Sequence, residues 1–235
     1  MKKTLQVAVM LIAGIRADAQ GTFQNLGFES ANVAPGIVAY GGIPASVALP
    51  YWTVTVNGTE TTVGCNVFNE FSPSVALISP GSDAGFIPIA GTYDVVLDAA
   101  GPNPVGASGY AAISQSGLIP AGTQSLLFDA TQSPTTSSGI LTVMLGNQVV
   151  PITPVATESF AGGSYSLYKA NISAWADQTA QLTFTALAPS GFEEWNAWFI
   201  DDISFSPNAV PEPSSLVLMG IGAITVLMRL KPKSS

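Results

Sequence analysis

Short stretches of alternating apolar and polar residues recur along most of the chain between residues 22 and 206. Alternation with a period of two, rich in β-branched and aromatic residues, predicts strands with one buried face. Clusters of Gly, Pro, Asn and Ser separate these stretches, as at Asn57-Gly58 and Pro80-Gly81. The predicted strands are residues 51–56, 75–79, 93–97, 125–129, 140–145, 165–172, 181–186 and 198–205. We therefore expect an all-β fold over residues 20–206, an antiparallel β-sandwich or jelly roll.

The N-terminal residues 1–19 follow a different pattern. Lys2 and Lys3 precede an apolar run over residues 5–15, and Ala17 and Ala19 form a small-x-small pair before Gln20. This order is typical of a secretory signal peptide that is cleaved before Gln20. The alternative is an amphipathic N-terminal helix that belongs to the fold.

The C-terminal segment, residues 207–235, starts as a linker and ends in a second apolar run. Val210-Pro211-Glu212-Pro213 precedes this run, which covers residues 216–228, and Arg229, Lys231 and Lys233 follow it. As a helix, residues 214–230 would reach about 25 Å, slightly less than a hydrocarbon core of about 30 Å. We expect a short transmembrane helix whose basic end stays in the cytoplasm, with the preceding body held outside.

This order of motif, apolar span and basic end resembles the PEP-CTERM sorting signal of exported bacterial proteins. The resemblance implies that an exosortase-type sorting protease recognises residues 210–213 and removes the tail. The protein would then pass from a transient membrane anchor to the cell envelope, the cell surface or the extracellular matrix. The alternative is a plain C-terminal anchor that is retained.

Composition narrows the chemistry that the body can perform. The chain of 235 residues has no histidine, which excludes Ser-His-Asp triads, HExxH zinc sites and imidazole bases. Its one cysteine, Cys65, excludes an intramolecular disulfide, so we expect a buried small hydrophobe or, alternatively, an intermolecular disulfide. Residues 20–209 contain thirteen acidic residues and one base, Lys169, a net charge of −12. We therefore do not expect this body to bind nucleic acid.

Three segments sharpen the expected fold. They are residues 25–29, followed by the aromatic pair of residues 51–52; residues 171–184, a turn around Trp175 that leads into a strand; and residues 198–205, the last predicted strand. Together they resemble the galactose-binding-like jelly-roll modules, many of which bind carbohydrates. The resemblance implies a β-sandwich that binds polysaccharide.

The same resemblance implies a structural calcium ion held by Glu29 with Asp201 or Asp202. Carboxylates and backbone carbonyls are the oxygen ligands that Ca²⁺ prefers. We expect Glu29 to end the first strand beside the last strand, and strand parity places Asp201 on the inward face with Phe199 and Ile203. The alternative has no metal, and Asp201 accepts backbone hydrogen bonds instead.

Tryptophans are the candidates for stacking on a sugar. Trp52 and Trp198 lie within predicted strands, which favours the core, whereas Trp195 follows an apparent loop and is the candidate ligand-binding residue. A Trp195 that merely covers the edge of the sandwich is the alternative.

These observations favour a non-enzymatic exported protein that is sorted to the cell envelope, the cell surface or the extracellular matrix and binds polysaccharide. The alternative is a structural matrix or adhesion component without a small ligand. A glycoside hydrolase that uses Glu193 and Glu194 is the least favoured function, since neighbouring residues on a strand point to opposite faces.

Overall fold

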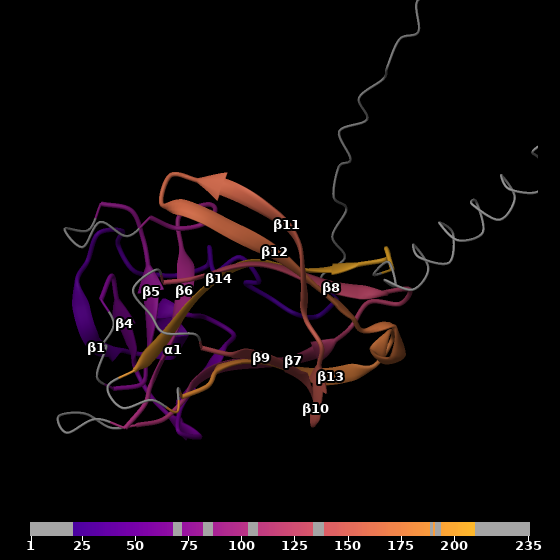
Figure 1. The fold of residues 1–235 in the computed structure, drawn as a ribbon, viewed down its shortest axis with the longest axis horizontal. Coiled ribbons are helices and arrows are strands. Elements are labelled where there is room, and N and C mark those ends of the chain that lie inside the picture. The colour runs from indigo at the N-terminus through magenta and orange to yellow at the C-terminus, as the bar shows by residue number, and fades with distance from the viewer. Residues whose placement is uncertain are drawn as a thin grey trace, which may run out of the picture.

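Two β-sheets stack face to face around an apolar core (Figure 1). The computed structural model describes residues 21–67, 72–81, 87–102, 108–133, 139–188, 190 and 194–209. The predicted cleavage site at Ala17, Ala19 and Gln20 therefore lies outside the described residues, as does the segment Val210, Pro211, Glu212 and Pro213 with the apolar run that follows it.

The larger sheet contains eight strands. Their spatial order is β1 (Ala39–Ile43), β4 (Val63–Cys65), β5 (Ser74–Ile78), β6 (Asp94–Ala100), β14 (Trp195–Ser206), β8 (Ser125–Gln132), β12 (Gly163–Asn171) and β11 (Thr153–Phe160). Neighbouring strands pair antiparallel except β4 and β5, which are parallel.

The smaller sheet contains six strands, all paired antiparallel. Their spatial order is β10 (Gln148–Val150), β9 (Leu141–Leu145), β13 (Thr179–Ala186), β7 (Ala111–Leu118), β2 (Thr53–Val56) and β3 (Thr59–Glu60). The described helical segments are short, α1 (Ala45–Ala48) and the 3₁₀ turn η1 (Ser173–Trp175). The expectation of an all-β sandwich is thus confirmed.

Each of the eight predicted strands is present, as β2, β5, β6, β8, β9, β12, β13 and β14. The turn around Trp175 is η1, which leads into β13 as the sequence predicts. Six strands were not predicted: β1, β3, β4, β7, β10 and β11. Several of these are very short, and β11 is exposed on both faces, so its residues show no alternation.

Aromatic side chains form a continuous chain through the core. The ring centroids of Phe28 and Trp52 lie 5.7 Å apart, those of Trp52 and Phe184 6.5 Å, and those of Phe184 and Phe128 5.1 Å. Tyr168 stacks on Phe128 at 5.3 Å. Each fully buried side chain of this size contributes about 1.5–3 kcal/mol by leaving water. Trp52 and Trp198 are buried in this core, which confirms the prediction for both.

A β-bulge in β14 changes which face its side chains occupy. The register with β8 shifts between Asp201 and Ser204, and Asp202 adopts a positive φ of 47°. Phe199 packs in a second apolar cluster, while Ile203 packs in the main core. The prediction that Asp201 shares one face with both was wrong, because the extra residue of a bulge reverses the alternation beyond it.

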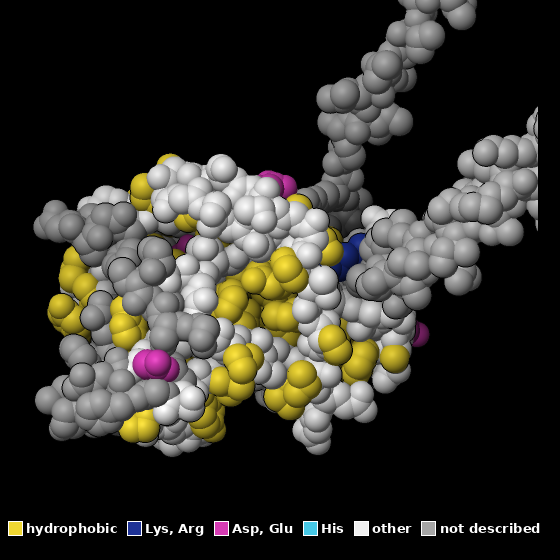
Figure 2. All heavy atoms as spheres, viewed as in Figure 1, with side chains coloured by type: hydrophobic (Ala, Val, Ile, Leu, Met, Phe, Trp, Pro, Cys, Tyr) yellow, Lys and Arg dark blue, Asp and Glu magenta, His cyan; other side chains and the backbone are white. Residues whose placement is uncertain are grey.

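The surface carries few basic side chains, as Figure 2 shows for one face. On this face apolar side chains gather in the opening between the two sheets. Within the described ranges, no helix is long and apolar enough to cross a membrane. Cys65 in β4 is free and buried, in agreement with the first of the two expectations for it.

The last described residues are attached to the body beside β8 and β12. The Lys169 ammonium donates a hydrogen bond to the Ala209 carbonyl at 3.0 Å, and the Ser125 hydroxyl donates to the Asn208 carbonyl at 2.7 Å. The chain therefore leaves the described body at a defined point of the larger sheet.

Candidate functional site

The predicted calcium ligand Glu29 lies in a turn, so the expectation that it ends a strand was wrong. The N-terminal segment nevertheless lies beside β14, because the Ile203 N–H donates to the Leu26 carbonyl at 3.1 Å. Glu29 Oε1 accepts hydrogen bonds from the backbone N–H groups of Thr92 at 2.7 Å and Tyr93 at 3.0 Å. Glu29 therefore attaches the N-terminal segment to the loop that precedes β6.

Two aspartates bind the same loop from the larger sheet. Asp201 Oδ2 accepts the Ala90 N–H at 3.0 Å, and its Oδ1 accepts the Asp202 N–H at 2.7 Å. Asp94 Oδ2 accepts the Ile89 N–H at 3.2 Å. The structure thus brings Glu29 and Asp201 to one loop, whereas Asp202 lies on the bulge with an exposed side chain.

Burial controls the protonation of these aspartates. Burial, with smaller contributions from the nearby charges of Asp202 and Glu29, raises the pKa of Asp201 to about 8. Burial also raises the pKa of Asp94 well above its usual range, and the charge of Asp201 adds to this effect. Asp201, with a pKa of about 8, is therefore held mainly as a neutral carboxylic acid at pH 7, and the pKa of Asp94 is shifted in the same direction.

Backbone N–H groups occupy part of the coordination capacity that a calcium ion would need. Ca²⁺ takes six to eight oxygen ligands, whereas here both oxygens of Asp201 and Oε1 of Glu29 accept hydrogen bonds from backbone N–H groups. Among the residues that the structure describes, no group of three His, Cys, Asp or Glu could hold a metal ion. The geometry favours the alternative in which Asp201 accepts backbone hydrogen bonds.

Trp195 is the first residue of β14 and does not lie in a loop as expected. Its half-buried ring packs against the second apolar cluster, which includes Ile78 and Phe199, together with Phe160 and Tyr165. This position on the outer face of the larger sheet resembles the alternative interpretation, a tryptophan that covers the sandwich.

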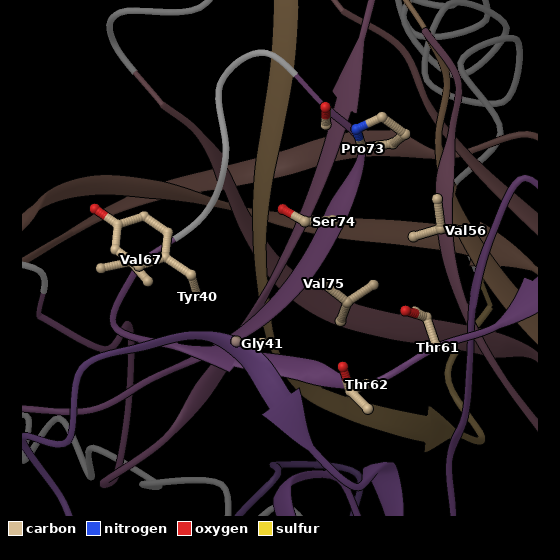
Figure 3. Close-up of a pocket in the computed structure, with 11 residues that line it drawn as sticks. Tyr40, Gly41, Val56, Thr61, Thr62, Val67, Pro73, Ser74 and Val75 are labelled. Atoms are coloured by element: carbon tan, nitrogen blue, oxygen red, sulfur yellow. The ribbon is translucent and has the colours of Figure 1, made fainter. Parts of the chain in front are cut away.

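A hollow of about 210 Å³ opens at the edge of the sandwich where β1, β4 and β5 face the end of β2 (Figure 3). Tyr40 lines it on one side, with Val56 and Thr61 on the other. We call this space the first hollow; its lining residues are Tyr40, Gly41, Val56, Thr61, Thr62, Gly64, Val67, Ser72, Pro73, Ser74 and Val75.

Glycines shape the wall of the first hollow. Gly41 and Gly42 follow Tyr40 with φ values of 135° and 86°, a region that favours glycine. Thr62 Oγ1 accepts the Gly42 N–H at 2.8 Å, which fixes β1 against residue 62. A Cβ atom on Gly64 would lie 2.9 Å from the Val67 carbonyl oxygen, so the backbone approaches here more closely than any side chain permits.

The described lining of the first hollow is uncharged and offers hydroxyl groups. Its described lining contains no Asp, Glu, Lys or Arg, in a body of net charge −12. Figure 3 shows the hydroxyl-bearing side chains of Thr61 and Thr62 across the hollow from Tyr40, with Val75 between them. Tyr40 is 84% exposed, which is exceptional for a large aromatic side chain.

No predicted strand or motif pointed to the first hollow. Its residues come from strands that lie far apart in the predicted order, and β1 and β4 were not predicted. A signal was present in the Tyr40-Gly41-Gly42 segment, where an aromatic residue precedes two glycines, and in the hydroxyl-rich residues 59–62.

Comparison with known proteins gives one sequence match and several distant structural ones. Residues 209–231 match the PEP-CTERM protein-sorting motif. No curated protein sequence matches the chain.

Among solved structures, TmCBM61 in complex with β-1,4-galactotriose is 14% identical and has a TM-score of 0.41; the match covers 80% of this chain and 99% of that one. The family 11 carbohydrate-binding module from Clostridium thermocellum, in complex with a β-1,3-1,4-mixed-linked tetrasaccharide, is 10% identical with a TM-score of 0.36; the match covers 75% and 99%.

The enzymatically active domain of bacteriophage CBA120 tailspike protein 4 is 11% identical with a TM-score of 0.37, and the match covers 75% of this chain and 21% of that one. The match to the sorting motif is more specific than the distant structural matches. The chain thus carries a PEP-CTERM protein-sorting motif behind a β-sandwich body, and it is an exported protein.

Proposed function

We propose that this exported protein is sorted to the cell envelope or surface by an exosortase-type protease and that its sandwich binds a neutral polysaccharide in the first hollow. The observation that carries the binding proposal is the exposed Tyr40 beside a space whose described lining is uncharged and carries hydroxyl groups. The sorting proposal rests on the motif at residues 209–231.

The chemistry of the first hollow suits a sugar ring. Sugar rings present apolar C–H faces that pack on an aromatic side chain, and their hydroxyl groups exchange hydrogen bonds with hydroxyl side chains. Tyr40 supplies the aromatic face, and Thr61 and Thr62 supply hydroxyl groups. The volume of about 210 Å³ lies below the range of drug-sized pockets, which suits one ring or the part of a chain that passes through.

Binding suits this site better than glycoside hydrolysis. Hydrolysis requires two carboxylates about 5–10 Å apart across the sugar, and the described lining of the first hollow has none. Glu194, from the acidic pair considered in the sequence analysis, precedes β14, and Glu193 lies outside the described residues.

The binding proposal is tested on an array of neutral and acidic glycans with the mature body and the variant Tyr40→Ala. We expect the parent body to be retained on neutral glycans. We expect this retention to fall at least about tenfold in Tyr40→Ala, because the variant loses one aromatic contact and its buried area. Tyr51→Ala is the matched control, because Tyr51 is also an exposed tyrosine and lines no described hollow. Equal retention of both variants would overturn the assignment of the site.

The sorting proposal is tested by replacing Pro211, Glu212 and Pro213 with alanine in the full chain. We expect the variant to accumulate in the membrane fraction while the parent chain is released to the surface. Alanine at Ser234 and Ser235, which lie beyond the matched residues, is the control. Normal surface release of the triple variant would refute the role of the motif.

A further inference from the structure

A second hollow, of about 140 Å³, lies at the same edge of the sandwich. We call it the second hollow; its lining residues are Ala45, Trp52, Thr53, Val54, Glu60 and Thr61. Thr61 lines both hollows, so they are neighbours on either side of this residue.

The position of Thr61 follows from the path of the chain. β3 ends at Glu60 in the smaller sheet, and β4 begins at Val63 in the larger sheet. Residues 61–62 therefore cross from one sheet to the other, and the Thr61 N–H donates to the Val54 carbonyl at 3.1 Å at the start of this crossing. The crossing segment is the ridge between the two hollows.

The two hollows are separate spaces that meet at one residue. Tyr40 in β1 borders the first and Ala45 in α1 borders the second, and Thr61 is the residue that their described linings share. A ligand that occupies both hollows therefore passes over Thr61, which suits a chain of rings better than a single ring.

The described lining of the second hollow differs from that of the first in carrying one charge. Glu60 is exposed, and it is the one carboxylate among its described lining residues. A carboxylate accepts hydrogen bonds from sugar hydroxyl groups and repels the carboxylates of acidic sugars. The second hollow therefore selects neutral rings over uronic acids.

We infer that the two hollows are consecutive subsites of one extended site, and that the chain binds the interior of a neutral polysaccharide across the ridge at Thr61. This inference rests on the proposed function and adds to it the length and the charge class of the ligand. Tyr40 packs on a ring in the first hollow, while Thr53 and Glu60 contact a ring in the second.

The test is calorimetric titration of the mature body with cello-oligosaccharides and β-1,4-galacto-oligosaccharides, from the monosaccharide to the pentasaccharide. In the series that binds, we expect affinity to rise with chain length until both hollows are filled. We expect this gain in affinity to be about 3- to 10-fold. Thr53→Tyr fills the second hollow, so we expect it to remove the gain without changing the affinity for the shortest ligand that binds.

Conservative variants show whether Thr53→Tyr acts by filling the second hollow or by disturbing the fold. Thr53→Val keeps the shape of Thr53 and is expected to retain the gain with chain length. Glu60→Gln keeps neutral binding but is expected to reduce the discrimination against the matching uronic-acid oligosaccharides, whereas Glu158→Gln, on β11 at the other edge of the larger sheet, leaves it unchanged.

The outcomes distinguish the two proposals. Binding that is independent of chain length, or unaffected by Thr53→Tyr, overturns the second subsite and leaves the first hollow in place. Retention of no neutral glycan on the array and no heat of binding in either series overturns the proposed function itself.

Discussion

Asp201 of β14 lies directly opposite Asp129 of β8 in the antiparallel ladder of the larger sheet. On the other side of β14, Ile200 pairs with Val95, and continuing this register places Asp201 beside Asp94. Three aspartates thus form one row across three adjacent strands, with exposed fractions of 0% for Asp94, 2% for Asp201 and 7% for Asp129. Like charges in such positions destabilise a sheet, and burial raises the pKa of both Asp94 and Asp201 in this row.

The first prediction concerns pH. The pKa of Asp201 is about 8 in the folded state and about 3.9 in an unfolded chain, so between these values the folded state binds more protons. The free energy of unfolding therefore falls as pH rises from about 4 to 8, by up to about 1.4 kcal/mol per pH unit for this group. Below pH 4 the group is protonated in both states and has no effect. Denaturant unfolding across this pH range measures the slope.

Asp201→Asn tests the source of this slope, because asparagine is neutral at every pH. We expect the variant to flatten the pH dependence, although one of the two backbone hydrogen bonds to Asp201 is lost. Asp177→Asn is the control, since Asp177 is exposed. A slope that is the same in Asp201→Asn and the parent chain would show that other groups cause it.

The second prediction concerns Glu29, which holds Thr92 and Tyr93 through one carboxylate oxygen. Glu29→Ala leaves two N–H groups without this acceptor, and we expect a loss of about 1–3 kcal/mol in the free energy of unfolding. Glu29→Gln retains an amide oxygen that accepts both hydrogen bonds, so its loss is expected to be smaller. Equal losses in the two variants would mean that the acceptor oxygen is not what stabilises the loop.

The third prediction concerns calcium. Because the carboxylate oxygens of Glu29 and Asp201 bind loop N–H groups, we expect neither EDTA nor millimolar CaCl₂ to change the Tm. Calorimetric titration of the metal-free protein with CaCl₂ gives the direct measurement. Calcium binding that raises the Tm and disappears in Asp201→Asn would restore the metal site that the sequence resemblance implies.

The fourth prediction concerns Cys65. Burial raises the pKa of its thiol to about 11, so very little reactive thiolate exists at neutral pH. We expect no labelling by a thiol reagent such as iodoacetamide in the folded protein and full labelling in denaturant. Rapid labelling of the folded protein would show that Cys65 is accessible, as the intermolecular disulfide requires.

The sequence predicted strands where one face of a strand is buried and the other is exposed. β13 alternates in this way along residues 179–186, and its strand pattern is clear. β11 lies at the edge of a sheet with both faces exposed, so burial imposes no pattern on residues 153–160. The bulge at Asp202 has no signal in the alternation itself, and it reversed the predicted face of the residues after it.

The candidate site was harder to predict than the fold. Tyr40 and Thr61 meet because residues 61–62 cross between sheets, and no local pattern specifies that crossing. The grouping of Glu29 with Asp201 was foreseen, because the resemblance paired the N-terminal segment with the last strand. In the structure the pair accepts backbone N–H groups of the loop before β6, and the calcium ion that the resemblance implies is what the third prediction tests.

The hydrogen bond from Lys169 to the Ala209 carbonyl fixes the point at which the described chain leaves the sandwich. The chain leaves the sandwich beside β12, and β4 and the first hollow lie five strands away in the same sheet. At about 4.8 Å per strand, this separation is about 24 Å. The proposed binding edge is therefore well separated from the point at which the described chain leaves the sandwich, so a partner that contacts the sandwich beside β12 would not crowd the first hollow.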